Sequence, residues 1–497
     1  MKITICAAFI SLFVAAMFFS QTSKTSAVQT SETKPENPQN CAACHQEKHA
    51  SWQQSNHGKT IRKATIETVR GDFVNVNYLE NAGVKAEMSR VGDDFYIKIG
   101  DENYKVAAVV GVKYIEQYVA EKDGEFYSLP VAYNFEEKRW INLSDTNFEK
   151  QNLQHLKNWQ TDCAACHRSG ENDLQKGFDN FGISCSACHG NSAEHIESKN
   201  SLWAKIGFKT DSKIVNPQSL SSDDSMMSCA SCHARDSSRF ESDNLISAHQ
   251  QTDDNADKYW ADGANKFSGN EYQSLIRSVC YAQSKAGGYG IEGEKITCAS
   301  CHSQHEPNLE NVVAEKSYNQ NCVNCHTQFD DLAAIAEHTK HQPNSEASNC
   351  ASCHQPDIIY ARTHFTRTHE ISVPNPLLTV EKQIPNACNL CHTDKSVNWA
   401  IASSAKLWAD RFRAAEISPD KQFDQPEAVR ALSSEDSFLR VLMFDSLGKH
   451  FDLKRSGSYL LRPTQTEINT ARQLFSEQNN PLKKKPDNLE NTENNDK

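Results

Sequence analysis

The chain has 497 residues, of which 38% are hydrophobic and 23% charged, and its formal net charge at pH 7 is −12. A mean hydropathy of −0.66 is low for a chain of this length that folds around an ordinary apolar core. The acidic balance argues against a nucleic-acid partner, because a phosphate backbone is bound through an excess of Lys and Arg.

The first residues have the pattern of an export signal. The stretch MKITICAAFISLFVAAMFF has one lysine followed by an apolar run, as in a secretory signal peptide. The run also approaches the ~20 apolar residues that span a bilayer, so an uncleaved anchor is the alternative. We expect a signal peptide or anchor over 1–27 and a flexible polar spacer over 28–40. An uncleaved anchor would be the only part of the protein in contact with a membrane.

A five-residue word, Cys-x-x-Cys-His, begins at residue 41 and occurs eight times. Cysteines at this spacing serve in zinc sites, disulfides or the covalent attachment of c-type haem, and only haem attachment needs histidine as the next residue. Histidine makes up 19 of the 497 residues, so eight such histidines have a chance of roughly 10⁻¹¹ if positions are independent. The two thiols bind the haem as thioethers, and the histidine becomes the proximal iron ligand.

The predicted cofactors are therefore eight covalently attached c-type haems. The cysteines that would attach them are Cys41, Cys44, Cys163, Cys166, Cys185, Cys188, Cys229, Cys232, Cys298, Cys301, Cys322, Cys325, Cys350, Cys353, Cys388 and Cys391. The predicted proximal ligands are His45, His167, His189, His233, His302, His326, His354 and His392.

After the first haem segment, 41–59, apolar and polar residues alternate in FVNVNY, FYIKIG and EFYSLPVAY, with turn signals at Gly92-Asp93 and Asp123-Gly124. This pattern predicts an antiparallel β module over 60–150. Seven motifs follow in an irregular region over 151–394. Apolar residues at three- and four-residue spacing then predict a helical segment over 395–480, and 481–497 should be a disordered tail. The expected fold is a mostly irregular multihaem cytochrome c with short α-helices around the haems, the inserted β module and an α-helical C-terminal segment.

A haem that only transfers electrons usually has two strong axial ligands. Beyond the eight proximal histidines, 11 remain for eight irons. The predicted second ligands are His57, His155, His195, His249, His305, His338 or His341, and His369, whereas His49 and His450 are assigned to the surface. His195 and His305 follow their own motifs so closely that we expect each to ligate a neighbouring haem.

Eight haems in one chain must lie close together. In a globule of about 350 residues their irons stand roughly 20 Å apart, and the macrocycle edges lie closer. The short step from His167 to Cys185 predicts an adjacent pair. We therefore predict an exported, periplasmic or otherwise extracytoplasmic, octahaem cytochrome that carries electrons between redox-protein donors and acceptors.

With these motifs in place, the chain resembles a family of exported multihaem cytochromes of the cytochrome c nitrite-reductase-like and tetratricopeptide-associated kind. The resemblance spans most of residues 40–400 and rests on CAACHQEKHASWQQSNH, VVGVKYIEQYV with SLPVAY and RW, GISCSACHGNSAEH, ITCASCHSQHE and IPNACNLCHTDKSVNWA. It implies octahaem-type electron carriers, some of whose relatives form extracellular conductive filaments. His57, His195, His305 and His369 match histidines expected to be ligands in that family.

One departure from the family bears on function. Trp260 stands where the family pattern Tyr-His-Ala-Asp-Gly has histidine, so one haem is either open or served by His249. An open haem would suit a reductase or oxidase of nitrite, hydroxylamine or sulfur oxyanions. Against this alternative, no motif has lysine in place of its histidine, the variant typical of ammonia-forming nitrite reductases. No catalytic residue is predicted.

Cys280 is left over after all motifs are filled. It is either a ligand or reactive thiol, or a small buried hydrophobic residue, which we favour. A filament or other oligomer, in which His49 or His450 serves a neighbouring subunit, is the third alternative.

Overall fold

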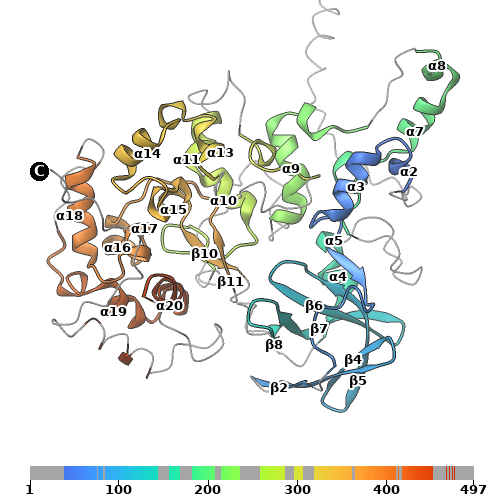
Figure 1. Ribbon diagram of the computed structural model, residues 1–497, viewed down its shortest axis with the longest axis horizontal. Coiled ribbons are helices and arrows are strands. Elements are labelled where there is room, and N and C mark those ends of the chain that lie inside the picture. The colour runs from blue at the N-terminus through green and yellow to red at the C-terminus, as the bar shows by residue number, and fades with distance from the viewer. Residues whose placement is uncertain are drawn as a thin grey trace, which may run out of the picture. The chain divides into compact units, whose positions relative to one another are not determined.

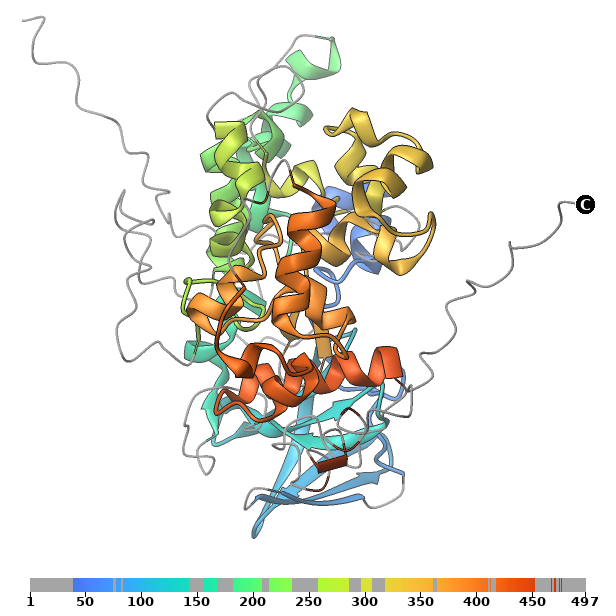
Figure 2. The ribbon, with the colours of Figure 1, turned by 90° about the vertical axis from the view of Figure 1, so that its left-hand side faces the viewer.

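The protein is described from a computed structural model (Figure 1 and Figure 2). The described residues are 39–74, 77–81, 84–143, 156–167, 182–207, 214–234, 258–285, 296–305, 318–360, 364–409 and 417–451, with a few isolated positions beyond. The predicted signal or anchor, most of the spacer and the tail lie outside them. Within these ranges, no helix has the length and apolar character needed to cross a membrane.

The predicted antiparallel β module is confirmed. Its strands are β1 Ile61–Lys63, β2 Asn77–Asn81, β3 Val84–Val91, β4 Asp94–Ile99, β5 Glu102–Val110, β6 Ile115–Lys122, β7 Glu125–Asn134, β8 Arg139–Asn142 and β9 Lys157–Asn158. The sheet order is β2-β3-β4-β5-β6-β7-β8, with β1 paired to β5 and β9 to β7. Asp123 and Gly124, both at positive φ (54° and 80°), form the two-residue turn between β6 and β7, as expected for a hairpin turn.

The alternating side chains of the strands form clusters of buried residues. Phe73 lies at the centre of one cluster, with its ring 5.1–5.4 Å from those of Phe95, Tyr118 and Trp140. A second cluster includes Val119 and Phe126 together with Trp159 and Ala164, which belong to α4 (Trp159–Asp162) and α5 (Ala164–His167). The sheet therefore packs directly against the helices that carry the second Cys-x-x-Cys-His motif.

Glu116 is a fully buried carboxylate that holds the segment before β2 against the sheet. Its side chain accepts hydrogen bonds from the backbone N–H groups of Arg70 and Gly71 and from the Tyr118 hydroxyl, at 2.9–3.1 Å. Glu116→Ala would leave the buried Tyr118 hydroxyl and the two part-buried N–H groups without this partner, and we expect it to lower the free energy of unfolding by about 3 kcal/mol. Urea unfolding followed by far-UV circular dichroism measures this change.

The exposed Glu121, on the same strand β6, provides the matched control. Glu121→Ala should leave the unfolding midpoint close to that of the unchanged protein. Equal midpoints for the two variants would show that the Glu116 contacts contribute little to stability.

The rest of the described chain consists mainly of short helices, as predicted. They are α2 Gln39–Ala42, α3 Gln46–Gln54, α6 Ser186–His189, α7 Ala193–Asn200, α8 Leu202–Lys205, α9 Ser222–His233, α10 Glu271–Arg277, α11 Val279–Lys285, α13 Tyr318–Val323, α14 Leu332–Thr339, α15 Cys350–His354, α16 Leu377–Lys382, α17 Ala387–Cys391, α18 Val397–Leu407, α19 Glu427–Leu432 and α20 Ser437–Phe451. A hairpin of β10 (Asp357–Tyr360) and β11 (His364–Arg367) interrupts them. Helices α18 to α20 fall within the predicted C-terminal helical segment, while the exact domain limits stay predictions.

Helices α19 and α20 share a hydrophobic cluster with residues from earlier in the chain. Leu432, Phe438 and Phe444 pack there with Trp260 and Ile359. Trp260 is only 7% exposed, and the Lys266 ammonium lies 5.0 Å from its ring centroid. Trp260 is therefore a packing residue of this cluster.

Candidate haem-binding sites

Each of the eight Cys-x-x-Cys-His motifs forms a turn of helix. In six of them the histidine N–H donates to the carbonyl of the first cysteine at 2.8–3.1 Å, and the other two lie within α9 and α15. Residues i, i+3 and i+4 share one face of a helix. Both sulfurs and the imidazole of each motif thus project to one side, as attachment of a single haem requires.

Six of the motif histidines face a second histidine ring at nearly constant distance. The centroid separations are 6.4 Å for His45 and His195, 6.0 Å for His189 and His305, 6.2 Å for His233 and His57, 6.0 Å for His302 and His369, 6.1 Å for His354 and His338, and 6.2 Å for His392 and His341. The members of each pair come from different segments, so tertiary folding brings them together.

These separations fit a metal held between two imidazoles. Histidine nitrogens bind transition metals at about 2.0 Å and the ring centroid lies roughly 1.2 Å behind the nitrogen, so two rings on opposite sides of one metal stand about 6.4 Å apart. All six pairs lie within about 0.4 Å of that value. The donor set therefore suits a haem iron with two axial histidines.

Hydrogen bonds also orient several of these rings. The Nδ1 atoms of His189, His354 and His341 lie 2.8, 2.8 and 2.6 Å from the backbone carbonyls of Val215, Ser372 and Thr339. When Nδ1–H donates to a carbonyl, Nε2 carries the lone pair and can bind a metal. The three rings are thus held in the tautomer that ligation needs.

The two histidines that closely follow a motif face other motifs. His195, on α7 just after the third motif, pairs with His45 of the first motif. His305, after the fifth motif, pairs with His189 of the third, and the two rings are inclined by only 8°.

The predicted ligands His155 and His249 lie outside the described residues. The ring of His167 lies 6.1 Å from that of Trp159.

His49 is buried, which shows that its assignment to the surface was wrong. It is 8% exposed, its ring lies 5.4 Å from that of Trp52, and its Nε2 has no hydrogen-bond partner among the described residues.

His364 is a buried residue that sequence reasoning left without a role. Its Nε2 lies 3.3 Å from a Glu136 carboxylate oxygen, and its ring lies 4.6 Å from that of Tyr114. Burial, and then the charge of Lys113, lowers the pKa of His364 to about 4, so the ring is neutral near pH 7. It joins the β10–β11 hairpin to the β module, a contact that no local pattern reveals.

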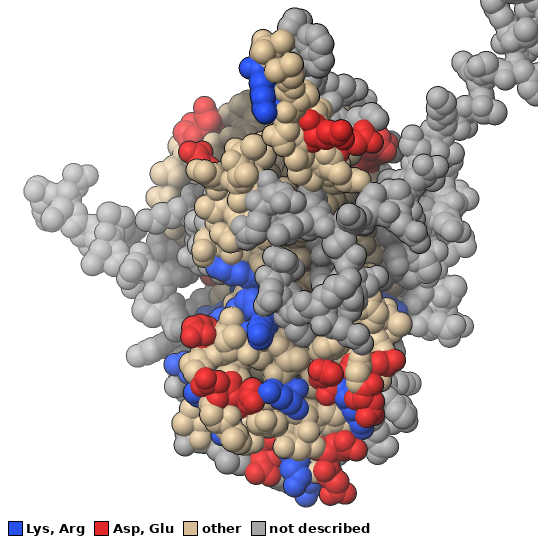
Figure 3. Space-filling model, turned by 90° about the vertical axis from the view of Figure 1, so that its right-hand side faces the viewer, with Lys and Arg blue, Asp and Glu red and all other residues tan. Residues whose placement is uncertain are grey.

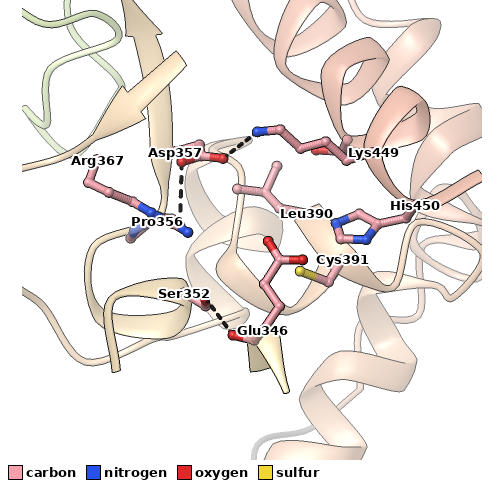
Figure 4. Close-up of a pocket in the computed structure, with 10 residues that line it drawn as sticks. Glu346, Ser352, Pro356, Asp357, Arg367, Leu390, Cys391, Lys449 and His450 are labelled. Atoms are coloured by element: carbon pink, nitrogen blue, oxygen red, sulfur yellow. Dashed lines mark hydrogen bonds and ion pairs between the residues drawn. The ribbon is translucent and has the colours of Figure 1, made fainter. Parts of the chain in front are cut away.

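A pocket borders the eighth motif at Cys391 (Figure 4). Glu346 and His450 also line it, so His450 is half-buried in a pocket wall rather than on the open surface. Asp357 accepts a hydrogen bond from Lys449 Nζ at 2.7 Å and pairs with Arg367 at 3.4 Å. The negative charge of Asp357 is therefore compensated by Lys449 and Arg367 beside the eighth motif.

The elements that carry the motifs contact one another. Helix α9, with the fourth motif, contacts α5, α6 and the 3₁₀ turn η7 (Cys298–Ser300), which carry parts of the second, third and fifth motifs. Helix α15, with the seventh motif, contacts α13 and α17, which carry parts of the sixth and eighth.

Cysteine side chains extend these contacts. The thiols of Cys229 and Cys298 are neighbours, as are those of Cys322 and Cys350. Burial and then the nearby Cys325 raise the pKa of the Cys301 thiol, so the fifth and sixth motifs are neighbours.

Cys280 lies close to the fifth and sixth motifs. Burial and then the neighbouring Cys325 raise the pKa of its thiol. A raised pKa disfavours the thiolate, which is the reactive form of cysteine. These surroundings suit the small hydrophobic role better than a reactive one.

Comparison with known proteins agrees with the motifs. A sequence model of the doubled CXXCH motif matches residues 291–331, and one of cytochrome c554 and c-prime matches residues 40–82. A search of curated proteins finds no match. The crystal structure of the outer cell wall cytochrome OcwA is similar at 15% identity and a TM-score of 0.49, covering 88% of this chain and 100% of that chain. The eight motifs and the two family matches identify this protein as a multihaem c-type cytochrome.

Proposed function

We propose that the protein is an exported octahaem cytochrome that carries electrons along a series of closely spaced haems between redox-protein partners. The observation that carries this proposal is the set of six facing histidine pairs at 6.0–6.4 Å. Two strong axial ligands close an iron to substrate and suit it to electron transfer. Haem supplies reversible one-electron chemistry, and the protein supplies ligation and spacing.

In this proposal the cysteines of all eight motifs attach haem and the motif histidines are proximal ligands. The second ligands are His195, His305, His57, His369, His338 and His341 for the first, third, fourth, fifth, seventh and eighth haems. Only one of His338 and His341 was expected to be a ligand. Both are proposed as ligands here, because their rings face different motif histidines. His155 and His249 stay proposed ligands for the second and sixth haems.

The contacts between motif-bearing elements support transfer from haem to haem. The fourth motif adjoins the second, third and fifth, and the seventh adjoins the sixth and eighth. Cys301 of the fifth motif and Cys325 of the sixth are neighbours, so the two groups of motifs adjoin. Haems attached to adjoining turns would be held close enough for electron tunnelling.

The surface agrees with a protein partner more than with nucleic acid. The net charge is −12, and Figure 3 shows acidic and basic side chains interspersed over the described part of one face. Mixed charge of this kind suits association with redox proteins. Export is proposed from the first 27 residues and from covalent haem attachment, which takes place outside the cytoplasm.

Spectroscopy of the purified full-length protein tests the proposal. A pyridine haemochrome assay and the intact mass should both count eight haems. EPR spectra of the ferric protein should show only low-spin haem, and nitrite should not change them. The absorption spectrum of the reduced protein should not change when carbon monoxide is added. A high-spin haem that binds either molecule would favour the reductase alternative. A haem count below eight would contradict the octahaem assignment.

A further inference from the structure

At the proposed haem site of the fourth motif, a carboxylate lies beside the proximal histidine. The Nδ1 atom of His233 lies 3.7 Å from a carboxylate oxygen of Glu271. The corresponding atoms of His189 and His354 lie beside neutral backbone carbonyls. The fourth proximal histidine thus has a full negative charge next to it.

Glu271 is held in this position by the fold. It is the first residue of α10, and its other carboxylate oxygen accepts a hydrogen bond from the Gly269 N–H at 2.8 Å. Helix α10 packs against α9, which carries His233. One oxygen of the carboxylate is therefore anchored to the backbone while the other faces the imidazole.

The same site also differs in the angle between its two rings. The planes of His57 and His233 are inclined by 78°, whereas the other five facing pairs are inclined by 8–28°. Perpendicular axial imidazoles leave two of the iron d orbitals nearly equal in energy, which produces a strongly anisotropic low-spin EPR signal. This signal allows the fourth haem to be followed separately from the parallel pairs.

The fourth motif also occupies a junction, because α9 contacts elements of the second, third and fifth motifs. Any difference in reduction potential at this position would affect how electrons are shared among three neighbours. Charge beside this haem therefore has more effect on the whole series than charge beside a terminal one.

We propose that Glu271 lowers the reduction potential of the fourth haem, which lies at the junction of the series. Ferric haem carries one more positive charge than ferrous haem, so a carboxylate next to the proximal imidazole stabilises the ferric state. Glu271 acts through His233 and is a positioning residue. The inference rests on the proposed function, since it assumes a haem with His233 and His57 as axial ligands.

The test uses the purified full-length holoprotein and three variants. Glu271→Gln removes the charge but keeps an oxygen for Gly269, and Glu271→Asp keeps the charge. Glu381→Gln removes an equal charge from an exposed position on α16. Each protein is reduced stepwise with dithionite at poised potentials, and the anisotropic EPR signal is measured at every step.

In Glu271→Gln the anisotropic signal should disappear at a higher potential than in the unchanged protein. Glu271→Asp and Glu381→Gln should stay close to the unchanged protein. If Glu271→Gln shifts no more than Glu381→Gln, the role of Glu271 is overturned while the octahaem proposal stands. If the unchanged protein has fewer than eight haems or lacks the anisotropic signal, the ligand assignment fails and the inference fails with it.

Discussion

Replacing His305 with alanine is expected to convert one of the proposed eight haems from low spin to high spin. The His305 ring lies 6.0 Å from that of His189 and nearly parallel to it, so its loss would open one face of the third haem. The ferric EPR spectrum should gain a high-spin signal, and the reduced variant should bind carbon monoxide at one haem per molecule. The haem content should not change, because both attaching cysteines remain.

His364→Ala is the matched control, since it also removes a histidine from the described haem region. The His364 ring contacts Tyr114 and its Nε2 pairs with Glu136, and we assign it no iron. This variant should stay fully low spin and should not bind carbon monoxide. A His305→Ala protein that behaves in the same way would show that His305 is not the second ligand of the third haem.

The double substitution Cys229→Ser with Cys232→Ser is expected to remove the fourth haem and to disrupt more than one site. Intact mass should fall by one haem if the other seven attach normally. The loss should also weaken packing around α9, because this helix contacts elements of three other motifs. Thermal unfolding followed by haem absorbance should show a clearly lower midpoint, and dithionite reduction should become slower and multiphasic.

Cys41→Ser with Cys44→Ser is the corresponding change at the first motif. This variant also loses one haem, but Cys44 is exposed and the motif lies near the start of the described chain. Its unfolding midpoint should fall less than that of the Cys229 and Cys232 variant. Equal losses of stability would contradict a central position for the fourth haem.

Features that depend on residues close together in the chain could be predicted from the sequence. The word Cys-x-x-Cys-His indicated haem attachment because, of the three uses of cysteines at this spacing, only haem attachment needs histidine as the next residue. Alternation in FYIKIG and the turn at Asp123-Gly124 indicated the antiparallel sheet because strands repeat every two residues. The proximity of His195 and His305 to their own motifs led to the expectation that each would face a different motif.

Features that join distant segments could be seen only in the folded chain. It paired His57 with His233 at an angle of 78°, buried His49, and placed both His338 and His341 opposite motif histidines. Glu271 reaches His233 from another helix, and nothing near either residue in the sequence signals that contact. The attachment motifs can be counted from the sequence because each is defined by the spacing of neighbouring residues. The pairing of rings and the charge beside each ring depend on how separate turns pack, because the residue that faces an imidazole can come from any part of the chain.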